Sequence, residues 1–481
     1  MTPQKNVLPS YQLVPEPTLR FHPERERDLE VHPLQGLRAY GPYSRKMPFS
    51  APDPMRLAVI CSQHAYDKVL TAIHELRTRH SPRERKNYLV DYDGFSSIYG
   101  IGLDCPQSDD DPRVVVLDQK EVDQALSGLT PHEKLAELVF TALRRLSLIR
   151  SQFDVVCVYL PNEWAVAFES SPDDEASDFN LHDSIKAVSS GLRIPVQVLN
   201  DRGLTYPCRC SVAWRLSLAL YTKAGGVPWK MAGFEDRHAY VGLGYCLRKA
   251  PERRFVTCCS QIFDSQGTNL QFLLFESRAG EYEGDNPFLP RSDMHRVISR
   301  TLSLYQAQKG RPPTRLVVHK TTHFTREEVD GCLDALATVD DVELLTLTQS
   351  TPWQGIKIDA PRTKGATKGE PAAYPLERGL LLPIGIYDYL LWTQGNCSAI
   401  GSNFFKEGKG IPHPIRITRH VGSGTFHESA REILALSKMN WNNDSLYDRL
   451  PVTTTYASLL AGIVKRMGPL SSLPYDFRYF M

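Results

Sequence analysis

Residues 181–229 read LHDSIKAVSSGLRIPVQVLNDRGLTYPCRCSVAWRLSLALYTKAGGVPW, and this stretch decides the fold. Its apolar spacing predicts a helix near 181–190 and a second helix over 211–226, which ends in two glycines suited to a helix C-terminus. Between them, IPVQVL (194–199) predicts a short buried strand. A helix, a strand and a helix in succession indicate a parallel sheet with helices on its faces.

The same alternation continues toward the amino terminus. The predicted elements are the strands MRLAVI (55–60), RVVVLD (113–118) and FDVVCVYLP (153–161), with helices at 65–80 and 132–149. We therefore expect an α/β, Rossmann-like domain over residues 51–230. Residues 1–50 are rich in proline and predict an extended arm or linker that lies on something else.

A different pattern starts after Trp229. Three consecutive strands are predicted at 238–248, 253–265 and 270–277, which is the opening meander of an RNase H-like sheet. The elements predicted after it are a helix at 292–307, a strand at 314–320, a helix at 325–339 and a last helix at 453–467. Residues 231–481 are therefore expected to form a second α/β domain.

Bulk composition sets limits on location and partners. With 42% hydrophobic and 23% charged residues, the 481-residue chain is typical of globular proteins. Its net charge is only +1, so a nucleic-acid surface must come from a local cluster of Lys and Arg. The ten cysteines lack zinc-type spacing, and no signal peptide or long apolar stretch is present. We expect reduced thiols and a cytoplasmic protein with no membrane contact.

Four side chains form a candidate phosphate site: His182, Lys186, Gln197 and Lys223. His182 and Lys186 are four positions apart and share one face of a helix. Gln197 lies near the carboxyl end of a parallel strand, where open α/β sheets bind ligands. Two cations, an imidazole and an amide suit a terminal phosphate. By spacing alone, a His and a Lys four positions apart more often indicate a solvated helix face.

The order H-x-x-x-K, I-P-x-Q-V and K-x-G-G-x-P-W resembles the MID domain of Argonaute proteins, as do residues 154–165 and 36–44. In that family these four side chains hold the 5′ phosphate of a guide strand, so the resemblance implies the same role here. It also implies that the terminal carboxylate of Met481 reaches the pocket near Gln197. There a bridging Mg²⁺ would join it to the guide phosphates.

The second half resembles the PIWI domain, most clearly over 436–464 and 315–331. Cutting members carry metal-binding acidic or imidazole side chains at positions matched here by Gly244, Thr321 and Ser458. None of these three residues supplies the charge that two divalent cations need. The resemblance therefore implies an inactive PIWI domain, and we expect no enzyme activity in this chain.

A PIWI domain that cannot cut can still hold a guide–target duplex in a positive channel. The candidate backbone contacts are Lys320, Arg416, Arg419, His420 and Lys438. Arg416 and Arg419 are three positions apart on a predicted strand and so face opposite ways. At most one of the two is expected to reach the same groove.

Only about 50 residues precede the first MID strand, so the resemblance is to short prokaryotic Argonautes without a PAZ domain. That class implies a guide RNA, a single-stranded DNA target from plasmid or phage, and a separate APAZ-containing protein. The APAZ protein carries a sirtuin-like, TIR or nuclease effector and forms a heterodimer that can assemble further on activation. The proline-rich arm is expected to order on such a partner.

Three alternatives stay open at this point. The chain is a PIWI-type metal-dependent nuclease with unusual ligands, for which Asp264 is the nearest candidate. It is a Rossmann-like nucleotide-binding enzyme, although no G-x-G-x-x-G follows the strand at 55–60. Or it is an interaction scaffold that has kept the fold without a guide.

Overall fold

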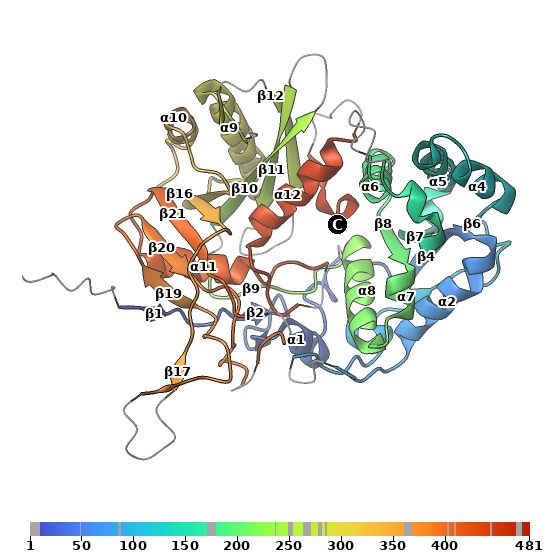
Figure 1. Ribbon diagram of the computed structural model, residues 1–481, viewed down its shortest axis with the longest axis horizontal. Helices are drawn as coiled ribbons and strands as arrows, with labels where there is room; N and C mark the ends of the chain where they lie inside the picture. The colour runs from blue at the N-terminus through green and yellow to red at the C-terminus, as the bar shows by residue number, and fades with distance from the viewer. Residues whose placement is uncertain are drawn as a thin grey trace, which may run out of the picture.

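Two sheets, each covered by helices, organise the chain (Figure 1). The computed structural model describes residues 10–48, 50–84, 88–170, 179–235, 237–248, 254–262, 271–277, 281–283, 286–359, 368–401, 404–407, 410–442, 445–467 and 474–481. Asp264 lies outside these residues. No helix in the described ranges is both long enough and apolar enough to cross a membrane.

The first sheet is parallel throughout. Its strands run in the order β5 (Leu103–Asp104), β4 (Met55–Ser62), β7 (Val155–Leu160) and β8 (Val196–Asn200), and β6 (Val114–Leu117) also pairs with β4. Alternate side chains of β4 enter two separate cores, Leu57 and Val59 on one face and Ala58 and Ile60 on the other. Strands buried on both faces read as continuous apolar runs, which is the pattern that the sequence shows.

Helices cover both faces of this sheet. One face carries α4 (Gln119–Leu126), α5 (Pro131–Ser147) and α6 (Leu181–Gly191). The other carries α2 (Tyr66–His74), α3 (Phe95–Tyr99) and α8 (Arg209–Lys223), while the short α7 (Asp201–Thr205) follows β8. The predicted Rossmann-like arrangement is confirmed, with helix ends shifted by a few residues.

The second sheet has ten strands and mixes both pairing directions. Its order is β1 (Gln12–Leu13), β19 (Leu380–Pro383), β20 (Asp388–Leu391), β21 (Ile415–Val421), β16 (Asp341–Thr348), β15 (Arg315–Lys320), β10 (His238–Arg248), β11 (Arg254–Ile262), β12 (Gln271–Ser277) and β22 (Tyr475–Asp476). The meander β10–β11–β12 is antiparallel, whereas β15 and β16 run parallel to β10. This is the predicted RNase H-like sheet.

Two pairs of helices sandwich the second sheet. α9 (Arg291–Lys309) and α10 (Arg326–Ala335) pack on one face, and α11 (Phe426–Leu436) and α12 (Val452–Val464) pack on the other. α12 crosses β10 and also contacts α6 of the first lobe, so it joins the two halves. Two short hairpins, β13 (Glu281–Glu283) with β14 (Asn286–Phe288) and β17 (Ile358–Asp359) with β18 (Glu370–Pro371), project from the sheet.

The amino-terminal arm differs from the prediction. From residue 10 onward it packs on its own chain: β1 extends the second sheet, and β2 (Leu19–Arg20) pairs with both β3 (Leu29–Glu30) and β9 (Lys230–Met231). A helix, α1 (Pro33–Tyr40), follows, capped by the buried His32. The expectation that the arm orders on a partner is wrong for residues 10–48, because they already fill main-chain and core positions of this chain.

Candidate nucleic-acid interface

Two buried lysines form the centre of the predicted phosphate site. Lys186 on α6 and Lys223, the last residue of α8, are 2% and 1% exposed. The Lys186 Nζ donates to the carbonyl oxygen of Val196 at 2.9 Å, and the Lys223 Nζ donates to Oε1 of Gln197 at 2.6 Å. The two helices and β8 therefore bring three of the four predicted residues to one place.

The lysines carry charge that their surroundings do not balance. Burial lowers the pKa of Lys186 to about 7 and lowers the pKa of Lys223 well below its ordinary value, with further repulsion from Lys186. Within the described residues neither ammonium forms an ion pair with a carboxylate. Asp183 is the nearest acid to oppose the shift at Lys186, but it pairs with Arg466. Buried cations without a partner are costly, and an anion offsets that cost.

His182 does not join this group. Its side chain is about half exposed, and its Nδ1 lies 3.3 Å from the carboxylate of Asp183. No contact between His182 and either lysine occurs in the described structure. One helical turn separates His182 from Lys186, but Lys186 alone turns into the crevice, which corrects the expectation that both grip the same ligand.

The carboxyl-terminal tail reaches the lysine site. Its last turn, η5 (Phe477–Tyr479), contacts both α6 and α8. The chain ends at the buried Met481, between α8, α12 and β8 (Figure 1). Gln197 does not fit the role of metal ligand, because its Oε1 already accepts from the Lys223 ammonium and its Nε2 donates to Val198. Of the two predicted ligands, only the terminal carboxylate of Met481 stays available to a cation.

A cavity of about 570 Å³ opens beside Gln197. Its walls come from the end of β8, from α7 and α8, and from two residues of the second half, Lys406 and Asn442. Arg202 and Arg215 add two cations, and no Asp or Glu contributes to the described lining. Because Gln197 lines this cavity and also binds Lys223, and because the lining is basic, the cavity extends the lysine site toward the second half.

Two further cavities are also lined without carboxylates in the part of the chain that the structure describes. One of about 490 Å³ contains Lys357, Lys406 and Arg449. Another of about 440 Å³ lies at the carboxyl ends of β15 and β16 and contains Arg416, His420 and several hydroxyl groups. Three neutral-to-basic cavities in a protein with a net charge of +1 require compensating acids elsewhere.

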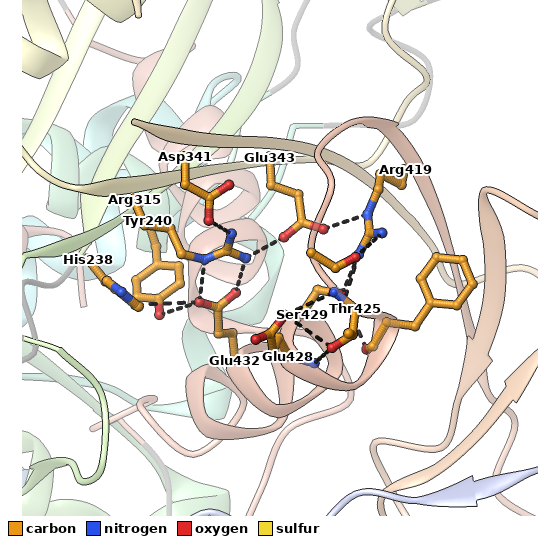
Figure 2. Close-up of polar contacts among 12 residues, drawn as sticks. His238, Tyr240, Arg315, Asp341, Glu343, Arg419, Thr425, Glu428, Ser429 and Glu432 are labelled. Atoms are coloured by element: carbon orange, nitrogen blue, oxygen red, sulfur yellow. Dashed lines mark hydrogen bonds and ion pairs between the residues drawn. The ribbon is translucent and has the colours of Figure 1, made fainter. Parts of the chain in front are cut away.

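Those acids gather at the opposite end of the second sheet, where its parallel strands begin. A cavity of about 740 Å³ there is lined by Glu235, Asp340, Asp341, Glu428 and Glu432. Figure 2 shows the ion-pair network behind it. Arg315 binds Glu432 at 2.8 Å and Glu343 at 2.5 Å, and Arg419 binds the other oxygen of Glu343 at 2.7 Å. The charge of the protein is thus segregated between two ends of the fold.

The structure contradicts three of the five predicted backbone contacts. The guanidinium of Arg419 donates to Glu343, within the network just described, and to the carbonyl oxygen of Gly424. Lys320 is fully buried, because it follows Leu316 and Val318 on the strand face that packs against α9 and α10, and it binds both oxygens of Glu328. Lys438 is buried against the arm, with Glu16 2.5 Å away. None of these cations reaches the surface to meet a phosphate.

Arg416 and His420 remain at the surface of the 440 Å³ cavity. The alternation of β21 turns Arg416 outward, half exposed and paired with Asp388 at 2.9 Å, while Arg419 turns inward. The Thr346 hydroxyl donates to the Thr322 carbonyl and so accepts from Nε2 of His420, at 3.0 Å. Burial, followed by repulsion from His323 and Lys320, lowers the pKa of His420, which keeps the ring neutral at pH 7.

The three positions that cutting PIWI domains use converge in this fold. Gly244, in the middle of β10, follows Leu243, which pairs with Lys320 at the end of β15, so Gly244 lies beside Thr321, the residue after β15. Helix α12 crosses so closely that a Cβ on Gly244 would lie 2.8 Å from the carbonyl oxygen of Ala457, next to Ser458. The position has no room for a carboxylate. Within the described residues no group of three His, Cys, Asp or Glu could hold a metal ion.

Sequence reasoning missed the cations that line the basic cavities: Arg202, Arg215, Lys357, Lys406 and Arg449. They come from five separate segments, and no local pattern links them. A usable clue was the chain order, since Arg202 follows directly after the strand that carries Gln197, at the edge where ligands bind.

No protein-family model and no curated protein sequence matches this chain. Several solved structures do match it. An Argonaute from Clostridium butyricum, bound to a guide DNA and a 19-mer target DNA, aligns over 98% of this chain with a TM-score of 0.67 and 14% identity. Drosophila Piwi aligns over 98% (TM-score 0.63, 14% identity), and A. aeolicus Argonaute over 100% (TM-score 0.61, 16% identity).

This chain spans 55 to 56% of the length of those structures. The aligned part contains both of its sheets, the site between α6, β8 and α8, and the crossing of β10 by α12. At this level of identity the likeness establishes the fold and leaves the ligand to be argued from the site. The protein has the α/β fold of the MID–PIWI half of Argonaute proteins.

Proposed function

We propose that this protein binds the 5′-phosphorylated end of a guide strand at Lys186 and Lys223. The observation that carries the proposal is the pair of buried lysines without a carboxylate partner among the described residues, beside the first two residues of β8 and next to the 570 Å³ cavity at the end of that strand. A phosphate monoester supplies the missing negative charge and accepts charge-assisted hydrogen bonds from both ammonium groups. Gln197 positions Lys223 for that contact.

The guide would leave this site through the 570 Å³ cavity, where Arg202, Arg215 and Lys406 can meet its next phosphates. Beyond it, the 440 Å³ cavity of the second half offers Arg416 to the backbone of a guide–target duplex. Contacts to phosphates fix register and carry no sequence information, so the guide bases select the target by pairing. We propose an RNA guide and a single-stranded DNA target.

Target cutting is not part of the proposed function. The three metal-binding positions carry Gly244, Thr321 and Ser458, and the first has no space for a side chain. A protein that finds a target without cutting it needs a second chain to respond. We propose an APAZ-containing partner with a sirtuin-like, TIR or nuclease effector, joined in a heterodimer that defends against plasmids or phage.

We propose that Mg²⁺ binds only when the guide phosphate is present. The chain offers the Met481 carboxylate, and the remaining ligands would be phosphate oxygens and water, as Mg²⁺ prefers. The two lysines repel a cation when the phosphate is absent. The ion would therefore strengthen guide binding without being required to build the site.

The test is purification of the full chain from cells, followed by sequencing of the nucleic acid that comes with it. Short 5′-phosphorylated strands are expected on the wild type and should fall by about tenfold or more in Lys186→Ala/Lys223→Ala, since each charge-assisted bond contributes ~1.5–3 kcal/mol. Lys120→Ala/Lys134→Ala removes the same charge from exposed positions on α4 and α5 and should keep the strands.

Equal loading of the two double variants would overturn the assignment of the site. Digestion of the bound strands with ribonuclease or deoxyribonuclease distinguishes an RNA guide from a DNA guide. Incubation of the loaded protein with labelled complementary DNA and Mg²⁺ or Mn²⁺ tests the absence of cutting. Cleavage there would favour the alternative of a nuclease with unusual ligands.

A further inference from the structure

Apart from Lys406 at its boundary, the 490 Å³ cavity of the second half has a built interior to which the proposed guide path assigns no role. Its described walls are formed by residues 355–357, 371–376, 394–395, 405–406, 410–413, 447 and 449. Lys406 lines both this cavity and the one beside Gln197, so the two adjoin. A cavity of this volume accepts one small organic ligand.

One wall is aromatic. The rings of Tyr374 and Phe405 lie 5.7 Å apart at an angle of 59°, and Tyr374 is 43% exposed. The floor is rigid, because the Tyr447 hydroxyl bonds to the backbone of Gly395 and the Tyr447 ring packs 4.5 Å from the guanidinium of Arg378. An open aromatic surface above a fixed floor suits a flat heterocycle.

Another wall carries an arginine without an acidic partner. Arg449 binds only the carbonyl oxygens of Gln349, at 2.6 Å, and Pro414, at 3.4 Å. Its Nε is buried and makes no hydrogen bond, and burial lowers the pKa of its guanidinium. No carboxylate in the described structure pairs with it. A partly buried guanidinium facing a cavity in this state indicates an anionic ligand.

Two further polar groups complete the lining. Lys406, which bonds to the hydroxyl of Ser445 at 3.0 Å, adds a second cation. The side-chain amide of Gln394 makes no hydrogen bond to any described residue and can both donate and accept. An amide of this kind can bind the edge of a nucleic-acid base.

We propose that this cavity binds a single unpaired nucleotide. The base lies against Tyr374 and Phe405, Gln394 reads its edge, and the phosphate meets Arg449 and Lys406. A base whose edge is read by Gln394 has that edge engaged by the protein and is unpaired. The chemistry fits a free nucleoside monophosphate and an unpaired residue of a bound strand alike, and the experiment separates these two sources.

The test uses isothermal titration calorimetry on the full chain carrying Lys186→Ala/Lys223→Ala, so that binding at the proposed guide site does not contribute to the signal. The probes are AMP, CMP, GMP, UMP, their deoxy forms, inorganic phosphate and a single-stranded hexanucleotide. Saturable binding of a monophosphate assigns a free nucleotide. Binding of the hexanucleotide alone assigns an unpaired residue of a strand.

In either case Tyr374→Ala should weaken binding by roughly 5- to 100-fold, the effect of one stacked base, while Tyr374→Phe should retain it. Tyr387→Ala removes an exposed tyrosine outside the cavity and is the matched control. Arg449→Gln should weaken binding independently of the ring. The proposal is overturned if Tyr374→Ala and Arg449→Gln leave both affinities unchanged, or if inorganic phosphate binds as tightly as every nucleotide. Because the lysines are already replaced, either failure leaves the guide-binding proposal intact.

Discussion

Lys223 and Gln197 are joined across the crevice between α8 and β8 by a hydrogen bond of 2.6 Å from Nζ to Oε1. One helical residue is thereby fixed against one strand residue that lies 26 positions earlier. Lys186 approaches from α6 on the other side and donates to the carbonyl oxygen of Val196, so that two amine side chains meet in a site without a carboxylate partner among the described residues. The site is formed before any ligand arrives, which lowers the entropic cost of binding one.

The first prediction concerns pH. The pKa values of Lys186 and Lys223 are lowered in the folded chain, to about 7 for Lys186. Between about pH 7 and pH 10 the unfolded chain therefore binds more protons than the folded chain, so the free energy of unfolding should rise with pH. Thermal melting at pH 7, 8 and 9 measures the slope.

A phosphate ligand should flatten this slope, because it restores the ordinary pKa values of both lysines. Lys186→Met should also flatten it and should raise the free energy of unfolding at pH 7 by on the order of 1–3 kcal/mol. Lys120→Met, at an exposed position, should leave the slope as it is. A slope equal in wild type and Lys186→Met would contradict the prediction.

The second prediction concerns the replaced metal-binding positions. Gly244→Asp should destabilise the protein by about 1–3 kcal/mol or more, since its Cβ would overlap the Ala457 carbonyl. Thr321→Asp, at an exposed position, should fold normally. Denaturant unfolding and a cleavage assay with Mn²⁺ check both variants.

Restoring acidic residues at Gly244, Thr321 and Ser458 together should therefore not restore cutting. A triple variant that folds with wild-type stability and cleaves a guided target would show that α12 can move away from β10.

The third prediction concerns the arm. Glu16 is buried between Arg378, at 2.9 Å, and Lys438, at 2.5 Å. Burial by itself raises the pKa of Glu16, but the two cations outweigh it and hold that pKa below its ordinary value. Glu16→Gln leaves two buried cations without their counterion and should cost about 3–5 kcal/mol. Glu24→Gln, at an exposed position of the same arm, should change stability by less than about 0.5 kcal/mol.

The stabilisation from Glu16 should be lost as pH falls below the ordinary carboxyl range, because the unfolded chain then binds the proton first. Wild type and Glu16→Gln should therefore converge in stability on acidification. Curves that stay parallel from about pH 5 down to about pH 2 would argue that the arm is held by its apolar residues alone.

The fourth prediction separates a surface arginine from a buried one on the same strand. Arg416→Gln should fold normally, weaken binding of a guided target uniformly across sequences, and reduce the slope of log affinity against log salt by about 1. Arg419→Gln should instead lower the melting temperature, because it leaves Glu343 with one partner fewer in the network of Figure 2. Filter binding across a salt series and thermal melting distinguish the two effects, and a salt slope unchanged by Arg416→Gln would remove that residue from the interface.

Periodicity in the sequence was enough to predict both sheets. β4, β7 and β8 are apolar runs between amphipathic helices, and such runs have few ways to bury both faces other than a parallel sheet. The order of short motifs also placed Lys186, Gln197 and Lys223 in one site, although Gln197 is the second residue of β8 and does not lie near its carboxyl end, the position that the sequence predicted. Local spacing could not tell that His182 stays at the surface.

What only the tertiary structure decided is which charges face water. Lys320, Arg419 and Lys438 are cations like Arg416, yet each is buried in an ion pair that the packing of separate elements forms: Lys320 with Glu328 on α10, Arg419 with Glu343 on β16, and Lys438 with Glu16 on the arm. The same holds for the basic cavities, which draw Lys406, Arg202 and Arg449 from separate segments. Sequence periodicity records which face of an element is apolar. The burial of a charge depends on long-range packing, and that is settled only when the two sheets, the arm and α12 close on one another.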